Sequence, residues 1–153
     1  MKTLIAYFSA EGTTAQVAKE AAGTLGADLF EIRPEVPYSA ADINWKNPLA
    51  RCNREKFGGK DVPVTGKIEG FDDYDMILIG FPIWYGGAPN VVNTFCGGYN
   101  WFGKRIAAFA TSGGSGIGKT AERLRPYLGS GDLLGAKLVH SGAELADWAK
   151  EIL

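Results

Sequence analysis

Apolar runs and amphipathic stretches alternate along this chain. The run Leu4–Phe8 is continuously apolar, as expected of a strand that is buried on both faces of a sheet. From Thr14 onward, apolar residues such as Val17 and Leu25 recur at helical spacing, and Gly26 can end that helix. The pattern therefore predicts a strand that leads directly into an amphipathic helix.

Four further short runs predict strands. They are Asp28–Ile32, Met76–Ile79, Ile106–Ala110 and Lys137–Val139. A last helix is indicated by Ser141 and Glu144, which can form a capping box ahead of an apolar face. Strands that alternate with helices predict right-handed crossovers and a parallel sheet covered on both faces, so we expect an α/β fold. A length of 153 residues suits a single domain spanning 1–153.

The loops after the first, third and fourth predicted strands matter most, because such sheets bind ligands beyond the carboxyl ends of their strands. The first of these loops, Ser9–Ala15, opens a helix. Gly12 permits a tight turn, and the first helical N–H groups can hold an anion together with the hydroxyls of Thr13 and Thr14. This neutral donor set suits a phosphate monoester, and an ordinary capped helix start is the alternative.

The second loop, Gly80–Pro89, places two adjacent aromatic residues between a proline and two glycines. Trp84 and Tyr85 offer flat faces for stacking on a planar ring, and Gly86 lets the backbone come close to it. Core packing of both aromatics is the alternative, but the Pro and Gly punctuation favours a loop. We therefore expect these residues to contact a ligand.

The third loop contains a competing motif. Gly113–Thr120 satisfies GxxxxGK[ST], the phosphate-binding loop of nucleoside triphosphatases. Such enzymes usually follow this loop with a strand that ends in an acidic magnesium ligand, and no apolar run after Thr120 ends in Asp or Glu. In the other interpretation the glycines form a compact loop and Lys119 is a solvated residue. A P-loop-type nucleotide-binding protein stays a remote alternative.

Taken together, the three loops resemble those of the flavodoxin family, and in particular its flavodoxin-like NAD(P)H-dependent oxidoreductase branch. The matching segments are Tyr7–Thr14, Pro82–Pro89, Thr111–Gly116 and, less closely, Tyr38–Arg51. The resemblance implies a flavodoxin-like three-layer sandwich with a five-stranded parallel sheet in the order 2-1-3-4-5. It also implies FMN as a non-covalently bound cofactor.

The resemblance also implies roles for individual residues. Those assigned to the phosphate are Ser9, Glu11, Gly12, Thr13, Thr14 and Ala15. Those assigned to the ring side are Pro82, Ile83, Trp84, Tyr85 and Gly86, with the two aromatics flanking the isoalloxazine. Those assigned to the pyrimidine edge are Ser112, Gly113, Gly114 and Gly116. Many flavodoxins have a hydroxyl residue at the place of Glu11, so we expect this carboxylate to point outward, away from the phosphate.

Composition and charge exclude several classes of function and location. Lys+Arg total 16 against 17 for Asp+Glu, a formal net charge of -1, which argues against nucleic-acid binding. The longest apolar stretch, Met76–Tyr85, is shorter than the ~18 residues that a membrane helix needs, so we expect a soluble cytoplasmic protein with no membrane contact. With only Cys52, Cys96 and His140 available, we expect neither a metal site nor a catalytic residue.

An FMN-binding electron-transfer protein is the function that these observations favour. Neutral phosphate ligands and apolar ring contacts disfavour added negative charge, so we expect a low reduction potential. The partner would be a redox protein, and the protein itself a monomer or a weak homodimer.

Two alternatives stay open besides the P-loop. One is an FMN-dependent NAD(P)H oxidoreductase that acts on a small-molecule acceptor of the quinone or nitro type. In that case the stretch Tyr38–Lys60 would shape the space over the ring, and its basic residues, Arg51, Arg54, Lys56 and Lys60, would attract the dinucleotide. The other is a binding module that kept the fold without the flavin.

Overall fold

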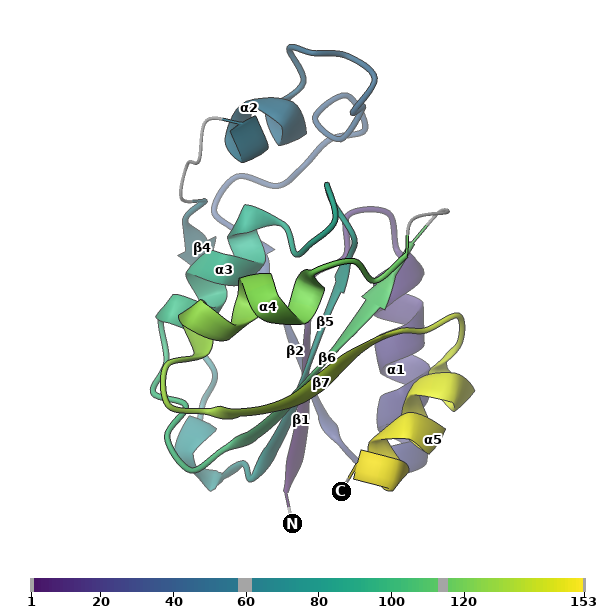
Figure 1. Ribbon diagram of the computed structural model, residues 1–153, viewed down its shortest axis with the longest axis vertical. Helices are drawn as coiled ribbons and strands as arrows, with labels where there is room; N and C mark the ends of the chain where they lie inside the picture. The colour runs from purple at the N-terminus through teal and green to yellow at the C-terminus, as the bar shows by residue number, and fades with distance from the viewer. Residues whose placement is uncertain (1, 58–61, 113–115, 153) are drawn as a thin grey trace.

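Five strands form one parallel sheet in the computed structural model, which describes residues 2–57, 62–112 and 116–152 (Figure 1). The strands are β1 (Thr3–Tyr7), β2 (Asp28–Glu31), β5 (Met76–Pro82), β6 (Arg105–Thr111) and β7 (Asp132–Leu138). Their order is β2-β1-β5-β6-β7, and every neighbouring pair is parallel. This confirms the predicted order, with the strand sequence reversing direction across the sheet between β1 and β5.

Helices cover both faces of the sheet. Helices α1 (Thr13–Leu25) and α5 (Gly142–Ile152) pack together on one face (Figure 1). The other face carries α3 (Asn90–Gly97), α4 (Thr120–Leu124) and the 3-10 helix η2 (Arg125–Leu128). A 3-10 turn, η1 (Phe71–Asp73), precedes β5. The chain therefore has the three-layer flavodoxin-like architecture that the loops imply.

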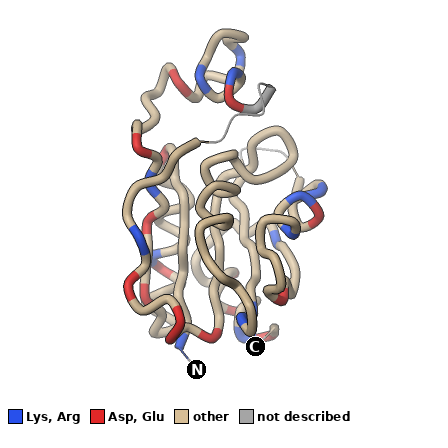
Figure 2. The backbone as a smooth tube through the Cα atoms, turned by 90° about the vertical axis from the view of Figure 1, so that its left-hand side faces the viewer, with Lys and Arg blue, Asp and Glu red and all other residues tan. Residues whose placement is uncertain are grey.

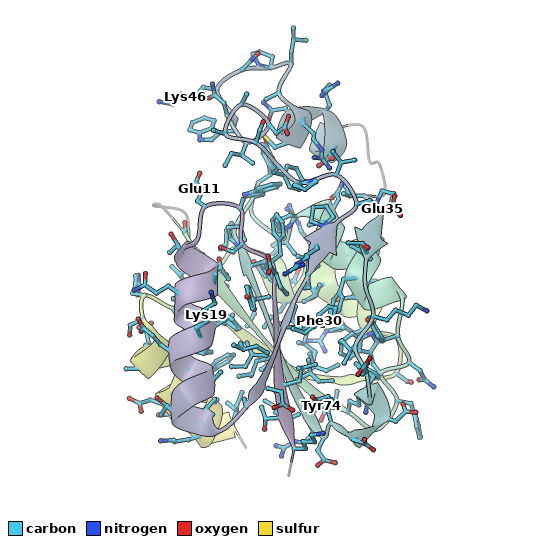
Figure 3. All side chains as sticks on the ribbon, turned by 180° about the vertical axis from the view of Figure 1, so that it is seen from behind. Glu11, Lys19, Phe30, Glu35, Lys46 and Tyr74 are labelled. Atoms are coloured by element: carbon cyan, nitrogen blue, oxygen red, sulfur yellow. The ribbon has the colours of Figure 1, made fainter. Side chains whose placement is uncertain are left out.

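One segment stands apart from these layers. Residues 36–57, which we call the cover segment, contain α2 (Arg51–Phe57) and extend beyond the carboxyl ends of the strands (Figures 1, 2 and 3). A two-stranded antiparallel ladder lies near its base and joins β3 (Arg33–Pro34) to β4 (Val64–Thr65). The cover segment therefore lies at the end of the sheet where ligands of this architecture bind.

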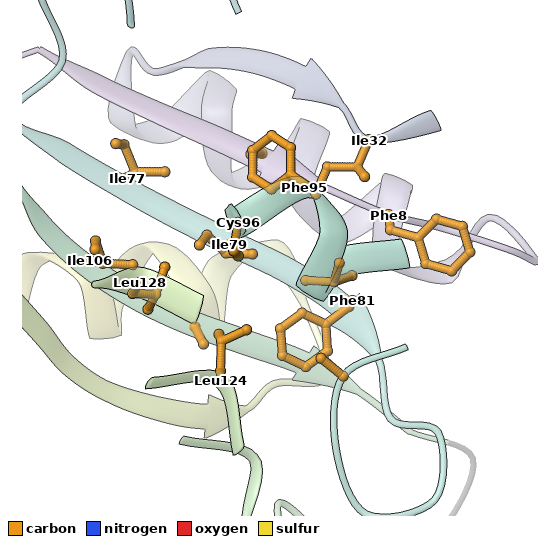
Figure 4. Close-up of a cluster of buried hydrophobic side chains, with 14 of the residues drawn as sticks. Phe8, Ile32, Ile77, Ile79, Phe81, Phe95, Cys96, Ile106, Leu124 and Leu128 are labelled. Carbon is orange, nitrogen blue, oxygen red and sulfur yellow. The ribbon is translucent and has the colours of Figure 1, made fainter. Parts of the chain in front are cut away.

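The core is divided by the sheet into two clusters, because side chains along a strand point alternately to opposite faces. In β5, Ile77, Ile79 and Phe81 face α3 and α4, where they meet Phe95 and Leu124 (Figure 4). The intervening Met76 and Leu78 face α1 and α5. All of these strand residues are fully buried, which explains why β5 appears in the sequence as a continuous apolar run.

Two element boundaries differ from the prediction by several residues. Strand β5 continues through Pro82, which pairs with Thr111 of β6, so Gly80, Phe81 and Pro82 belong to the strand rather than to the loop. Strand β7 begins at Asp132 rather than Lys137, because pairing with β6 supports residues whose own pattern is weak.

Within the cover segment, the Asn47 side chain accepts a hydrogen bond from Leu49 N at 3.0 Å, and helix α2 begins at Arg51. An Asx turn of this kind offers the backbone an alternative to helix.

The capping box before α5 is confirmed on one side only. Ser141 Oγ accepts a hydrogen bond from Glu144 N at 3.1 Å, as expected. The Glu144 carboxylate reaches back to His140 N, at 3.2 Å, rather than to Ser141 N. The His140 ring is exposed and lies beside the same carboxylate, 3.4 Å from it. No helix in the described ranges has the length and hydropathy needed to cross a bilayer.

Candidate functional site

A cavity of about 350 Å³ opens where β1, β5 and β6 end. Its walls come from three loops and from the cover segment. The residues that line it are Ser9, Ala10, Glu11, Thr13, Thr14, Ile43, Trp45, Pro82, Ile83, Trp84, Thr111 and Ser112. Segments from all three predicted ligand loops therefore meet around one space.

Donors gather at one end of this cavity, where β1 passes into α1. Gly12 has a φ of 97°, a left-handed conformation that favours glycine, and its N–H donates to Ser9 Oγ at 3.0 Å. The first helical hydrogen bond runs from Gln16 N to Gly12 O. The amides of residues 13–15 therefore precede the helical ladder, at the positive end of the helix dipole.

Two threonines tie this loop to the end of β6. Thr14 Oγ1 and Thr111 Oγ1 lie 2.7 Å apart and both residues are buried. Each hydroxyl has a single proton, so one threonine donates to the other and the acceptor keeps its own proton for a further partner. The pair thus ties the helix start to β6, and one of its two hydroxyl protons stays available to a further acceptor.

Charge is sparse at this cavity. No Lys or Arg occurs among the described residues that line it. Glu11 lines the rim, and its side chain is exposed and stands away from the loop, as Figure 3 shows. An anion held in the loop would be bound by neutral donors, as the sequence predicts, with the Glu11 carboxylate left in solvent.

Trp84 forms the aromatic wall. Its ring packs edge-to-face against Phe8, at 5.7 Å between centroids, and against Tyr38, at 5.4 Å. Trp84 and Gly87 exchange backbone hydrogen bonds, which close a two-residue turn. Tyr85 and Gly86 form that turn with φ values of 56° and 77°, the pattern of a type I′ turn. The Trp84 ring is therefore held rigidly at the edge of the cavity.

Tyr85 is directed away from this cavity, toward the cover segment. Its hydroxyl donates to Asn53 Oδ1 and lies 3.5 Å from Cys52 Sγ. Burial, followed by the contact with Cys52, raises the pKa of Tyr85 above its ordinary value. Tyr85 therefore fastens α2 to the turn and does not line the first cavity, while its predicted place beside the ring stays a prediction.

A second cavity of about 280 Å³ adjoins the first. Its lining residues are Ile43, Trp45, Cys52, Ile83, Trp84 and Tyr85, none of them charged. Trp45 and Ile43 line both cavities and were not among the predicted site residues. The available signal was an aromatic residue in an otherwise polar stretch, which does not indicate a contact by itself.

Arg51 holds the cover segment together through contacts within it. Its Nε donates to Glu55 Oε2 and its Nη1 to Val36 O, both at 2.8 Å, and its guanidinium lies 4.0 Å from the centre of the Tyr38 ring. The Tyr38 hydroxyl also donates to Glu55. Because Arg51 is engaged in this way, it is not a free cation for a dinucleotide.

Arg54, Lys56 and Lys60 were also expected to attract a dinucleotide. The described contacts do not bring these residues together around a site. Arg54 is exposed, while the Lys56 side chain and Lys60 lie outside what the structure describes.

The remaining predicted residues have different positions. Gly113 and Gly114 lie outside the described residues. Gly12, Ala15, Gly86 and Gly116 are described but do not line the first cavity. The first three belong to the loop, helix start and turn that shape it, and Gly116 is exposed.

The competing P-loop motif has little structural support in its described part. Lys119 is exposed, whereas Thr120 is fully buried and its hydroxyl donates to Ile117 O. A magnesium ligand would need that hydroxyl to be accessible. Among the described residues, no group of three or more His, Cys, Asp or Glu side chains could hold a metal ion.

Comparison with known proteins adds independent findings. A family model described as Flavodoxin matches residues 2–152. A crystal structure of a candidate flavoprotein from Bacteroides eggerthii is 36% identical, with a TM-score of 0.91, and the match covers 99% of this chain and 97% of that one. A candidate flavoprotein from Bacteroides uniformis is also 36% identical, with a TM-score of 0.89 and 97% of each chain covered.

A more distant structure has the same fold with its ligand present. This flavoprotein from Lactobacillus acidophilus, solved in complex with FMN, is 23% identical, with a TM-score of 0.75, over 97% of this chain and 98% of that one. No curated protein sequence matches the chain.

Proposed function

Because this chain belongs to the flavodoxin family, we propose that it binds FMN in the cavity at the ends of β1, β5 and β6 and serves in electron transfer. The observation that carries the proposal is the composition of that cavity. Helix amides and hydroxyls lie at one end of the cavity, and the Trp84 ring lies at the other. The same cavity can therefore bind both a phosphate and a flat ring.

The residues present fit this cofactor. Ser9, Thr13 and the Thr14–Thr111 pair supply neutral donors for the phosphate. Trp84 and Trp45 supply apolar surface for the ring, and Ser112 lies beside them at the end of β6. When bound, FMN supplies reversible uptake of one or two electrons, while the protein determines its position and potential.

The lining also supports a reduction potential below that of free FMN. Its described residues include no cation, and Trp84, Ile83 and Pro82 form an apolar surface. Added negative charge on a ring in such surroundings is poorly stabilised. A redox titration of the holoprotein measures the potential, and a value above that of free FMN contradicts this part of the proposal.

The visible spectrum of the purified protein is the first test. We expect a yellow protein that releases FMN on denaturation. A colourless protein that takes up no added FMN would contradict the proposal and leave a flavin-free binding module.

Substitution of Trp84 tests the ring side of the site. Trp84→Ala removes the aromatic wall and should raise the Kd for FMN by about tenfold or more, which is a loss of at least ~1.4 kcal/mol. Titration of apoprotein by flavin fluorescence quenching measures this. Lys119→Ala is the matched control and should leave the Kd unchanged, since Lys119 is exposed and does not line the cavity. The reverse pattern would favour the P-loop motif.

One observation favours a second candidate function, reduction of a small-molecule acceptor by NAD(P)H. The second cavity, about 280 Å³, adjoins the proposed ring position and has no charged lining residue. It could receive a small uncharged acceptor such as a quinone or a nitroaromatic compound. Sustained oxidation of NADPH by the holoprotein with such an acceptor supports this function, and no turnover with a panel of acceptors contradicts it.

A further inference from the structure

The tip of the cover segment is unusually exposed and apolar for its position beside the site. Every residue from 44 to 49 is exposed. Trp45 and Leu49 retain 66% and 79% of their accessible surface. Residues 44–49 together with Arg54 of α2 are called the docking patch below. Exposed large apolar side chains next to a functional cavity are a common feature of interaction surfaces.

The charges of the cover segment leave this patch positive. Its described acids, Asp42 and Glu55, both lie beside Arg51, at 3.9 Å and 2.8 Å. A backbone hydrogen bond from Ser39, together with the charges of Arg51 and Arg54, holds the pKa of Asp42 below its ordinary value. In contrast, Lys46 and Arg54 are exposed and form no ion pair with another described residue. The unpaired charge at the tip is therefore basic.

The far end of the molecule carries charges of both signs, with several acids among them. Asp72, Asp73 and Asp75 precede β5 and Asp132 starts β7, while Lys2, Lys104 and Arg105 lie at the starts of β1 and β6. Figure 2 shows several Lys and Arg residues together with acidic ones in the cover segment at the top, and residues of both signs toward the lower end. With a net charge of only -1, this distribution matters more than the total. An acidic partner would be attracted to the exposed cations of the cover segment.

Trp45 connects the patch to the cofactor cavity. It lines that cavity and yet keeps 66% of its surface exposed. The acid that lines the cavity, Glu11, belongs to the β1–α1 loop at the proposed phosphate end rather than to the cover segment. A partner seated on the tip would therefore meet apolar and basic side chains directly beside the ring.

We propose that the docking patch receives a redox partner protein whose contact face is acidic. The proposal rests on the proposed function, since it takes the adjacent cavity to hold FMN. A protein is favoured over a dinucleotide because Trp45 and Leu49 present exposed apolar surface, while Lys46 lies 5.7 Å from the centre of the Trp45 ring and Arg54 is exposed on α2, a combination that suits a protein interface.

Two electron acceptors of opposite charge test the proposal. FMN-loaded protein is reduced anaerobically with dithionite and mixed in a stopped-flow instrument with cytochrome b5, which is acidic, or with cytochrome c, which is basic. We expect oxidation by cytochrome b5 to slow down as the ionic strength rises from ~0.01 M to ~0.2 M. Oxidation by cytochrome c should not show this dependence.

Charge-reversal variants locate the effect. Lys46→Glu combined with Arg54→Glu should slow oxidation by cytochrome b5 by about tenfold at low ionic strength. Lys19→Glu is the matched control, since Lys19 is exposed on α1, away from the cover segment (Figure 3), and should have less than a twofold effect. Leu49→Ala should slow the same reaction at high ionic strength as well, because its contribution is not electrostatic.

The outcomes are distinct. A protein that holds no flavin contradicts the proposed function before this test begins. A flavin-loaded protein whose rate with cytochrome b5 is insensitive to salt, or equal in the Lys46 and Arg54 variant, overturns the docking proposal alone. A raised KM for NADPH in that variant, with unchanged cytochrome rates, also overturns it and assigns the basic residues to a dinucleotide.

Discussion

At the scale of single residues, Gly80 shows how tightly the sheet is packed. A Cβ at this position would lie 2.0 Å from Cζ of the Phe109 ring, which crosses β5 on the side of α1 and α5. The absence of a side chain at residue 80 is therefore what allows Phe109 to be fully buried there.

We expect Gly80→Ala to destabilise the protein by about 1–3 kcal/mol, because the added methyl group must displace the Phe109 ring. Gly23→Ala is the control: its Cβ would meet nothing within 4 Å on the exposed side of α1. It should stabilise the protein by about 0.5–1 kcal/mol. Urea denaturation measures both, and equal effects of the two substitutions would contradict the packing argument.

The Thr14–Thr111 pair combines stability with ligand binding. Thr14→Val or Thr111→Val alone leaves one buried hydroxyl without its partner, at 2.7 Å in the wild type, and should cost about 1–3 kcal/mol. The double substitution removes both hydroxyls, so it should recover part of that stability. If the pair also supplies a proton to the phosphate, FMN affinity should stay low in the double variant. If the double variant regains both its stability and its FMN affinity, the pair does not donate a proton to the phosphate.

At the scale of elements, Tyr74 fastens the edge strand β2 to the start of β5. Its hydroxyl donates to Asp28 Oδ2 at 2.7 Å, and Asp28 is the first residue of β2. Burial, followed by the hydrogen bond to Asp28, raises the pKa of Tyr74 to about 12. The folded protein therefore holds this proton more tightly than the unfolded chain, in which the pKa lies near ~10.

The stabilisation from Tyr74 should consequently be complete below pH ~10 and should be lost as the pH rises toward ~12. Tyr74→Phe should lower the free energy of unfolding at pH 8, and its difference from the wild type should shrink between pH ~10 and ~12. Urea denaturation across this range measures the effect. Tyr127→Phe, at an exposed position, should show no such trend.

The cover segment shows where sequence patterns lose their predictive value. Its residues were expected to shape the space over the ring, and Ile43 and Trp45 do line the cavity there. The contacts that hold it, from Arg51 to Val36 and from Tyr85 to Asn53, join residues with no periodic relation. Such contacts depend on the tertiary arrangement, so the direction of Tyr85 could not be inferred.

At the scale of the whole molecule, FMN should contribute measurably to stability, because a ligand that binds only the folded state shifts the unfolding equilibrium. Free FMN at a hundredfold excess over its Kd should add about 2.7 kcal/mol relative to the apoprotein. For a chain of this length, that corresponds to a rise in Tm of about 5–10 °C. Thermal scans of the apoprotein with FMN or riboflavin measure it, and equal shifts for the two would argue against a bound phosphate.

The order of the strands in the sheet was implied by the resemblance to the flavodoxin family, and the structure confirms it. The sequence alone determined which segments form strands and where the helix after β1 starts, because continuous apolar runs, helical spacing and Gly12 act over short stretches of chain. It also indicated which loops would meet, since parallel strands bring their carboxyl ends to one edge. Only the tertiary structure decided that Thr14 meets Thr111, that Tyr85 turns toward Cys52, and that Trp45 reaches the cavity from the cover segment. These contacts join positions far apart in the chain, where chain packing rather than local preference sets the distance between side chains.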